Sequence, residues 1–148
     1  MTTIAKITPA DRDDWLELWR GYLAFYEASV ADDVTESTFA RIVADEELHG
    51  AMARDAEGRA VGIVHWLSHP ATWTASTYTY LEDLFVAPGT RGGGVGRALI
   101  EHVKSCAEGE GSHKVYWLTH ETNATARALY DKVATSTGFV HYEIPLGR

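Results

Sequence analysis

The sequence contains a single cysteine, Cys106, among its 148 residues. One thiol cannot close an internal disulfide, and so little cysteine is typical of a protein from a reducing compartment. No apolar run reaches the roughly 18 residues that a membrane span needs, and the first residues lack the basic and then apolar layout of a secretion signal. We therefore expect a cytoplasmic protein that does not engage a membrane.

Positive charge is also scarce, with 13 lysines and arginines against 21 carboxylates and a formal net charge of −8. This balance disfavours general binding to nucleic acid. No metal is expected, because the histidines show no ligand spacing: His120-Glu121 begins like a zinc-protease motif, but Ala124 stands where the second histidine should be. The length and the 45% hydrophobic composition suit one folded domain over residues 1–148.

The hydrophobic periodicity predicts an α/β fold in the order β-α-α-β-β-β-α-β-α-β. Thr8-Pro9-Ala10-Asp11 has the composition of a helix start, and Thr122 or Asn123 caps the last helix. Further helices are expected over 35–45 and after a glycine-rich turn near 92–96. The expected strands lie near 2–8, 48–55, 60–67, 77–87, 114–118 and 140–146.

The glycine-rich turn joins an apolar strand, 80–87, to a helix with an apolar stripe. Backbone N–H groups of Gly92, Gly93, Gly94, Val95 and Gly96 can converge on an anion at the positive end of that helix, and Arg91 and Arg97 add charge. The turn fits neither the Walker pattern, which needs a lysine, nor the dinucleotide fingerprint. It predicts a pyrophosphate site, and a turn that binds nothing is the alternative.

The remaining pattern, Arg91-x-x-Gly94-x-Gly96, resembles the acyl-CoA loop of the GCN5-related N-acetyltransferases (GNAT). This resemblance implies the GNAT fold, a mixed and mostly antiparallel central sheet flanked by helices, with acetyl-CoA as co-substrate. Asn123-x-x-Ala126-x-x-x-Tyr130 followed by Gly138-Phe139 is similar to the second signature of that family. There the asparagine contacts the cofactor and the tyrosine is the usual general acid.

Acyl transfer to an amine needs an anchored thioester, a donor for the oxyanion, a base for the ammonium and an acid for the thiolate. We expect Glu82 to be the base and Tyr130 the acid. Backbone N–H groups of Leu84, Phe85 and Val86 are expected to serve the cofactor if their strand splays from its neighbour. A surface carboxylate and a packing tyrosine are the alternatives for Glu82 and Tyr130.

The acceptor is expected beside the first helix. Tyr22, Tyr26 and Glu27 at its end, with Asp83 on the strand, are candidate substrate-binding residues. The alternatives are a helix that only faces the core and a solvated acidic loop. Cys106 lies on the apolar stripe of its helix, which favours direct transfer in a ternary complex over an acyl-cysteine intermediate.

One stretch, Trp15-x-x-Leu18-Trp19-x-x-Tyr22, resembles the yeast histone/polyamine and D-amino-acid acetyltransferases. A second, Tyr80-Leu81-Glu82-Asp83-Leu84, is similar to the diamine (spermidine/spermine and thialysine) acetyltransferases. The resemblance implies a small primary amine as acceptor and a homodimer that shares its last strand. The other hypotheses are an enzyme that acetylates a protein lysine or N-terminus and a non-catalytic acyl-CoA sensor.

Overall fold

A computed structural model describes residues 1–90 and 93–148 of the chain. The described residues form two compact units, 1–117 and 118–148, and each is presented by itself. Arg91 and Gly92, two of the expected anion-binding residues, lie outside the described residues. Within the described part of the chain, no helix is long and apolar enough to cross a membrane.

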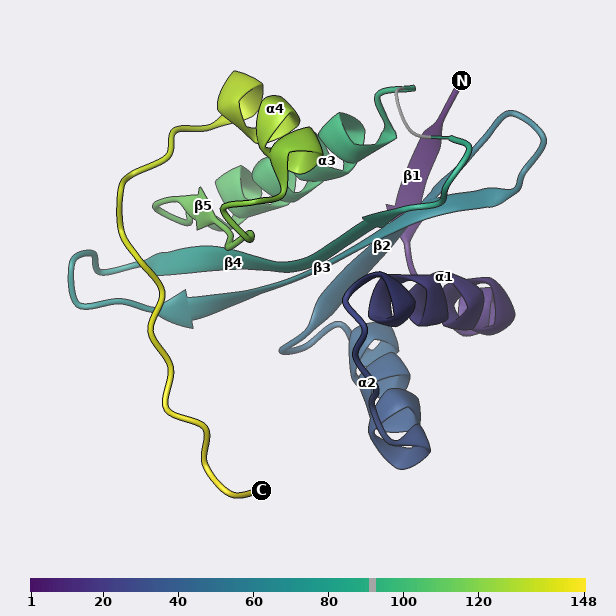
Figure 1. Cartoon of the computed structure of the whole chain (residues 1–148), viewed down its shortest axis with the longest axis horizontal. Helices are drawn as coiled ribbons and strands as arrows, with labels where there is room; N and C mark the ends of the chain where they lie inside the picture. Colours follow the sequence, from purple (N-terminus) through teal and green to yellow (C-terminus); the bar gives the residue numbers. More distant parts are fainter. Residues whose placement is uncertain (91–92) are drawn as a thin grey trace. The chain divides into compact units, whose positions relative to one another are not determined.

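The first unit contains a five-stranded sheet in the order β1-β2-β3-β4-β5 (Figure 1). Neighbouring strands pair antiparallel except β4 and β5, which are parallel. The strands are β1 (Thr3–Lys6), β2 (His49–Arg54), β3 (Ala60–Pro70), β4 (Thr77–Val86) and β5 (Val115–Tyr116). This confirms the predicted mixed, mostly antiparallel sheet, although β5 is shorter than expected.

The helices of the first unit cover both faces of the sheet. Helices α1 (Arg12–Phe25) and α2 (Asp32–Ala44) lie on one face, and α3 (Val95–Glu110) lies on the other (Figure 1). We call these the α1 face and the α3 face. A one-turn 3-10 helix, η1 (Pro9–Asp11), leads into α1, and the Asp11 carboxylate accepts the Thr8 N–H at 2.8 Å, as a capping residue does.

Aromatic side chains dominate the core on the α1 face. Trp15 and Trp19 are buried on α1 and stack with ring centroids 5.6 Å apart, and Phe39 of α2 packs against Trp15. From the sheet, Met52 of β2, Ile63 of β3 and Phe85 of β4 join this cluster. The predicted aromatic stripe of α1 is therefore buried in the core at its beginning. At its end it becomes accessible to solvent, where Tyr26 is 39% exposed.

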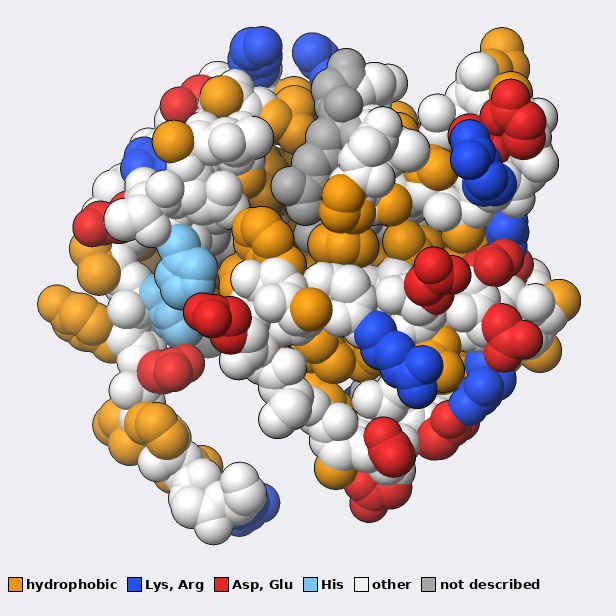
Figure 2. Space-filling view, turned by 45° about the vertical axis from the view of Figure 1, so that its right-hand side comes forward, with side chains coloured by type: hydrophobic (Ala, Val, Ile, Leu, Met, Phe, Trp, Pro, Cys, Tyr) orange, Lys and Arg blue, Asp and Glu red, His pale blue; other side chains and the backbone are white. Residues whose placement is uncertain are grey.

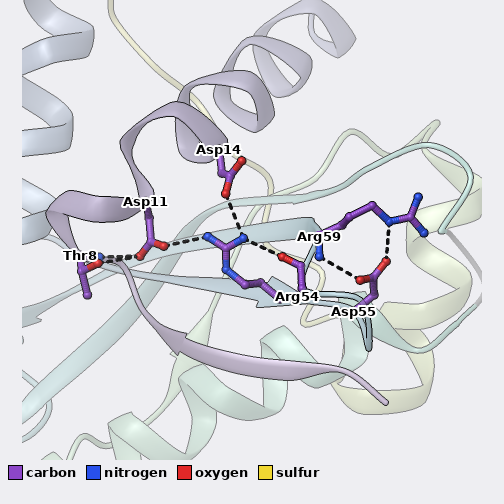
Figure 3. A network of polar contacts seen from close by, with 7 residues as sticks. Thr8, Asp11, Asp14, Arg54, Asp55 and Arg59 are labelled. Carbon is purple, nitrogen blue, oxygen red and sulfur yellow. Dashed lines mark hydrogen bonds and ion pairs between the residues drawn. The ribbon is translucent and has the colours of Figure 1, made fainter.

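Arg54 ties the start of α1 to the β2–β3 turn (Figure 3). Its guanidinium donates to Asp11 at 2.8 Å, lies 2.9 Å from Asp14 and donates to the Gly58 carbonyl at 3.0 Å. Burial opposes ionisation of Asp11, but hydrogen bonds from Thr8 and Arg54 outweigh it and lower the pKa of that carboxyl. The network fixes the direction from which α1 crosses the sheet.

The second unit contains α4 (Ala124–Val133) and an extended segment, 134–148. The strand predicted over 140–146 is wrong for this chain: none of the described residues 134–148 is in a strand. An alternating sequence becomes a strand only against a neighbouring ladder. Large apolar side chains of the segment remain exposed, such as Phe139 at 93% and Tyr142 at 89%, and apolar atoms are visible along this tail in Figure 2.

Candidate active site

An irregularity in β4 organises the candidate site. His65 of β3 pairs with Asp83, but Trp66 pairs with Leu81, so Glu82 is an extra residue that forms a β-bulge. A regular strand would place Tyr80 and Asp83, three residues apart, on opposite faces. The extra residue shifts the alternation of side chains by one position, so Tyr80 and Asp83 lie on the α1 face together with His65.

Asp83 lies beside two side chains from different elements. The His65 Nδ1 lies 2.9 Å from Asp83 Oδ2, and the side chains are only 7% and 17% exposed. Tyr22 on α1 lies close to the same carboxylate, whose charge contributes to the raised pKa of the tyrosine. The structure thus brings together two of the predicted substrate residues, Tyr22 and Asp83.

Glu82 lies beside this group with a solvent-accessible side chain. Partial desolvation raises the pKa of Glu82, and the neighbouring Asp83 charge raises it further, while the positive charge of Arg41, and that of His65 whenever it is protonated, lowers it. A carboxyl with a raised pKa is a stronger base once it is ionised, which suits proton transfer from an amine.

Three tyrosines lie close to the two carboxylates, and a fourth packs against one of them. Burial, followed by the Asp83 charge, raises the pKa of both Tyr22 and Tyr26, and burial together with the Glu82 charge raises the pKa of Tyr80. Tyr80 packs against Tyr116 of β5 with ring centroids 4.9 Å apart. These hydroxyls stay protonated at neutral pH, and rings beside carboxylates form a favourable environment for an organic cation.

The edge of β4 beyond the bulge is the second feature of the site. β5 pairs with β4 only at Thr79 and Tyr80, and within the described chain no strand continues along that edge. The Ala87 N–H donates to the Val61 carbonyl at 2.8 Å. Because antiparallel N–H groups alternate in direction, those of Leu84 and Val86 point toward this edge.

Phe85 differs from its two neighbours. Its side chain is 7% exposed in the core on the α1 face, and the same alternation directs its N–H toward β3. Of the three predicted backbone donors, only Leu84 and Val86 therefore point outward. The sequence suggested that β4 splays from its neighbour. In the structure, the parallel pairing of β4 with β5 ends after Tyr80.

The described part of the glycine-rich turn follows β4. Gly94 is the N-cap of α3 with φ of 80°, a left-handed conformation that glycine adopts without strain, and no atom lies within 4 Å of a Cβ built there. Gly93 directly precedes this N-cap, and Val95 is the first, buried residue of the helix. The Arg97 guanidinium pairs with Glu101 one turn later at 3.2 Å.

The remaining predicted residues lie apart from this group or in the second unit. Glu27 lies in the turn after α1 with φ of 51°. Asn123 is confirmed as the N-cap of α4, where its side-chain oxygen accepts the Ala126 N–H at 3.4 Å. Tyr130 is half-buried on α4.

Sequence reasoning missed His65 and Trp15, although a signal was present. His65 stands two residues after Ile63 on β3, so both side chains are on the face that packs against the core, and the other residues of that stretch are apolar. A polar residue on an apolar face needs a partner. The sequence does not reveal that the partners are Trp15, 50 residues before His65, and Asp83, 18 residues after it.

The chain belongs to the acetyltransferase (GNAT) family, whose sequence model matches residues 12–134. It is therefore an acetyltransferase, as the motifs predicted.

Two characterised relatives match most of the chain. D-amino-acid N-acetyltransferase HPA3 of Saccharomyces cerevisiae is 39% identical over 142 residues, which cover 95% of this chain and 88% of that protein. Thialysine N-epsilon-acetyltransferase of Caenorhabditis elegans is 24% identical over 130 residues, covering 88% and 80% of the two chains.

Solved structures share the fold at lower identity. Ribosomal-protein-alanine N-acetyltransferase from Brucella melitensis biovar Abortus 2308 superposes with a TM-score of 0.83 at 21% identity, covering 99% of this chain and all of that one. The enzyme AAC(6')-Iy, in complex with a CoA-containing bisubstrate analogue, gives a TM-score of 0.85 at 19% identity, covering 99% of both chains.

Proposed function

We propose that this acetyltransferase transfers the acetyl group of acetyl-CoA to a primary amine of a small molecule. The observation that carries the proposal is the pair of carboxylates at the β4 bulge, Glu82 and Asp83, framed by tyrosines. Negative charge and aromatic rings together recognise an ammonium group. The acetylated amines named for the two relatives, D-amino acids and thialysine, belong to the same chemical class.

The residues present fit acetyl-CoA, which supplies the acetyl thioester. Gly94 gives the turn a left-handed N-cap, the space beside its Cα is open, and the α3 dipole favours a phosphate there. Leu84 and Val86 direct their N–H groups to the edge of β4, where they can serve the pantetheine and the thioester carbonyl. Gly93, Val95, Gly96, Arg97 and Asn123, with Arg91 and Gly92, complete the proposed cofactor site.

In the proposed reaction, Asp83 binds the acceptor ammonium and Glu82 takes a proton from it, either directly or through water. The neutral amine then attacks the thioester carbonyl. Tyr130 protonates the departing thiolate, a role supported by its place in the second family signature. Tyr22, Tyr26 and Glu27 are the proposed walls of the acceptor site.

Direct transfer in a ternary complex is part of this proposal. Burial, followed by the charges of Glu110 and Asp45, raises the pKa of the Cys106 thiol, which disfavours the thiolate that an acyl-cysteine route needs. Initial rates with both substrates varied should therefore give intersecting lines, because a covalent intermediate gives parallel ones.

We further propose that the enzyme is a homodimer in the cytoplasm. The location is supported by the single cysteine, which is typical of a reducing compartment. The dimer is supported by the family resemblance and by the exposed apolar side chains of the tail, which include Ile144 at 86% and Leu146 at 72%. Sedimentation should show a dimer that Ile144→Asp weakens, and a wild-type monomer at micromolar concentration would refute it.

The proposed reaction is tested by CoA release with a panel of acceptors. The panel contains spermidine, putrescine, lysine, thialysine, D- and L-amino acids and a histone-tail peptide. We expect turnover of a small amine, with losses in kcat for Glu82→Gln and Tyr130→Phe and no loss for Glu57→Gln, an exposed hairpin carboxylate.

Other outcomes of this panel favour the other hypotheses. Turnover of the peptide alone would favour a protein acetyltransferase. Binding of acetyl-CoA without any turnover, seen as a raised melting temperature, would favour a sensor. A full rate in either the Glu82 or the Tyr130 variant would remove that residue from the mechanism.

A further inference from the structure

A buried hydrogen-bond chain leads from the core to Asp83. The Trp15 indole Nε1 donates to His65 Nε2 at 3.0 Å, and the opposite ring nitrogen of His65 lies 2.9 Å from the Asp83 carboxylate. Trp15 is 1% exposed and His65 is 5% exposed, so no bulk solvent reaches the first bond of this chain.

The chemistry of these groups fixes the proton on His65. An indole N–H can only donate, so the Nε2 atom that faces Trp15 must accept and carries no proton. In a neutral imidazole the proton is then on Nδ1, from which it is donated to Asp83. Protonation of both nitrogens would set two donors against each other 3.0 Å apart.

The consequence concerns the charge of Asp83. A doubly protonated His65 would form an ion pair with Asp83 and cancel the negative charge that faces the solvent side of the site. A neutral His65 fixes the carboxylate with a single hydrogen bond and leaves its charge intact. Tyr22, the other neighbour of the carboxylate, is also neutral, because burial and the Asp83 charge raise its pKa.

We propose that Trp15 and His65 are positioning residues that orient Asp83 and keep its charge uncompensated for the acceptor ammonium. This inference rests on the proposed function, in which Asp83 binds that ammonium. Neither residue touches the reacting atoms, and both act through Asp83.

The titratable groups around His65 belong to β4, α1 and α2. On β4, the titratable neighbours are Asp83 and Glu82, and on α1 Tyr22 lies beyond Asp83. From α2, Arg41 acts electrostatically on Glu82. Gly50 of β2 adds no side chain, and a Cβ there would lie 3.3 Å from His65 Cδ2.

The test begins with the proton positions on His65, measured by long-range 1H–15N NMR correlation on the whole protein. We expect the Nδ1–H tautomer in the wild type at pH 7. Trp15→Phe keeps an aromatic ring but removes the N–H, so His65 should take up a second proton as the pH falls. Trp19→Phe is the matched control, because the Trp19 indole donates to Thr35 at 3.3 Å and should leave the tautomer unchanged.

Kinetics then connect the tautomer to acceptor binding. The ratio of the amine KM of Trp15→Phe to that of the wild type should rise several-fold from pH 8 to pH 5.5, with little change in kcat or in the KM of acetyl-CoA. His65→Asn keeps an N–H donor toward Asp83 and should retain a nearly normal amine KM. His65→Leu lacks that donor and should raise the amine KM several-fold.

Several outcomes would overturn the positioning role. They are an Nε2–H tautomer or an imidazolium in the wild type at pH 7, an equal response of His65 to the two tryptophan variants, and a pH-independent KM ratio. If the wild type turns over no amine, the proposed function fails, while the tautomer and its response to Trp15→Phe still decide the hydrogen-bond chain. If His65→Leu does not fold, the two tryptophan variants carry the test.

Discussion

Gly50→Ala is a sensitive test of how tightly α2 packs on the sheet behind the candidate site. A Cβ at Gly50 would lie 2.6 Å from Ile42 Cγ2 and 3.0 Å from Ile7 Cδ1. Carbon atoms in contact prefer about 3.5–4.0 Å, so one of these groups must move by about an ångström. Ile42 is 1% exposed and Ile7 is fully buried, so neither can turn toward solvent.

Overpacking of this kind costs about 1–3 kcal/mol. For a chain of this length, each kcal/mol lowers the melting temperature by roughly 2–4 °C, so Gly50→Ala should melt several degrees lower. Gly109→Ala makes the same chemical change in the last turn of α3, where no atom lies within 4 Å of the new Cβ. That control should be neutral or stabilising by up to about 1 kcal/mol.

Thermal and urea unfolding, followed by circular dichroism, give both values. A Gly50→Ala protein as stable as Gly109→Ala would refute the packing of Ile42 and Ile7 around Gly50. The variant also probes the site, because the added methyl group would press on His65 Cδ2 from 3.3 Å. We therefore expect its amine KM to rise in addition to the loss of stability.

Three further predictions follow from single contacts. Asp83→Asn removes a charge that raises the pKa of Glu82, so the acid limb of the kcat/KM profile should move to lower pH, and the amine KM should rise. A shift of this limb to higher pH would contradict the assignment of Glu82 as the base. Gly94→Ala places a side chain at φ of 80° and should cost about 1–2 kcal/mol and weaken acetyl-CoA binding in calorimetry, whereas unchanged affinity would remove Gly94 from the cofactor site. Arg54→Met should lower the free energy of unfolding at pH 7 by about 1–3 kcal/mol; because the pKa of Asp11 is lowered in the folded state, this loss should shrink as the pH falls below 3.8, and a loss that is constant with pH would count against the pair.

Local features of the fold were predictable because they depend on short stretches of sequence. Thr8 and Asp11 form the expected cap, Asn123 caps α4, and Gly94 begins α3 in the conformation that glycine favours. The strand over 140–146 was not predictable in the same way. Its alternation is genuine, but strand formation depends on a partner ladder that a sequence pattern does not contain.

The site was predictable in part. The motifs indicate that Glu82 and Asp83 lie on a strand before a glycine turn, and the structure confirms that placement. A regular alternation of side chains along β4 would nevertheless put Tyr80 and Asp83 on opposite faces. The sequence pattern does not reveal that one extra residue is inserted between them. The bond from Trp15 to His65 likewise depends on how α1 crosses β3.

The bulge explains why two adjacent carboxylates and several tyrosines can act on one acceptor. In a regular strand, Asp83 would share its face with Leu81, a buried residue that has no polar group to offer the acceptor. With Glu82 as the extra residue, Tyr80 takes that place, and its hydroxyl experiences the charges of both Glu82 and Asp83. His65, paired directly with Asp83, then supplies the hydrogen bond that holds the carboxylate, and Tyr22 approaches it from α1. A single additional residue in β4 therefore turns a strand that would only pack against the core into one that presents charge to a substrate.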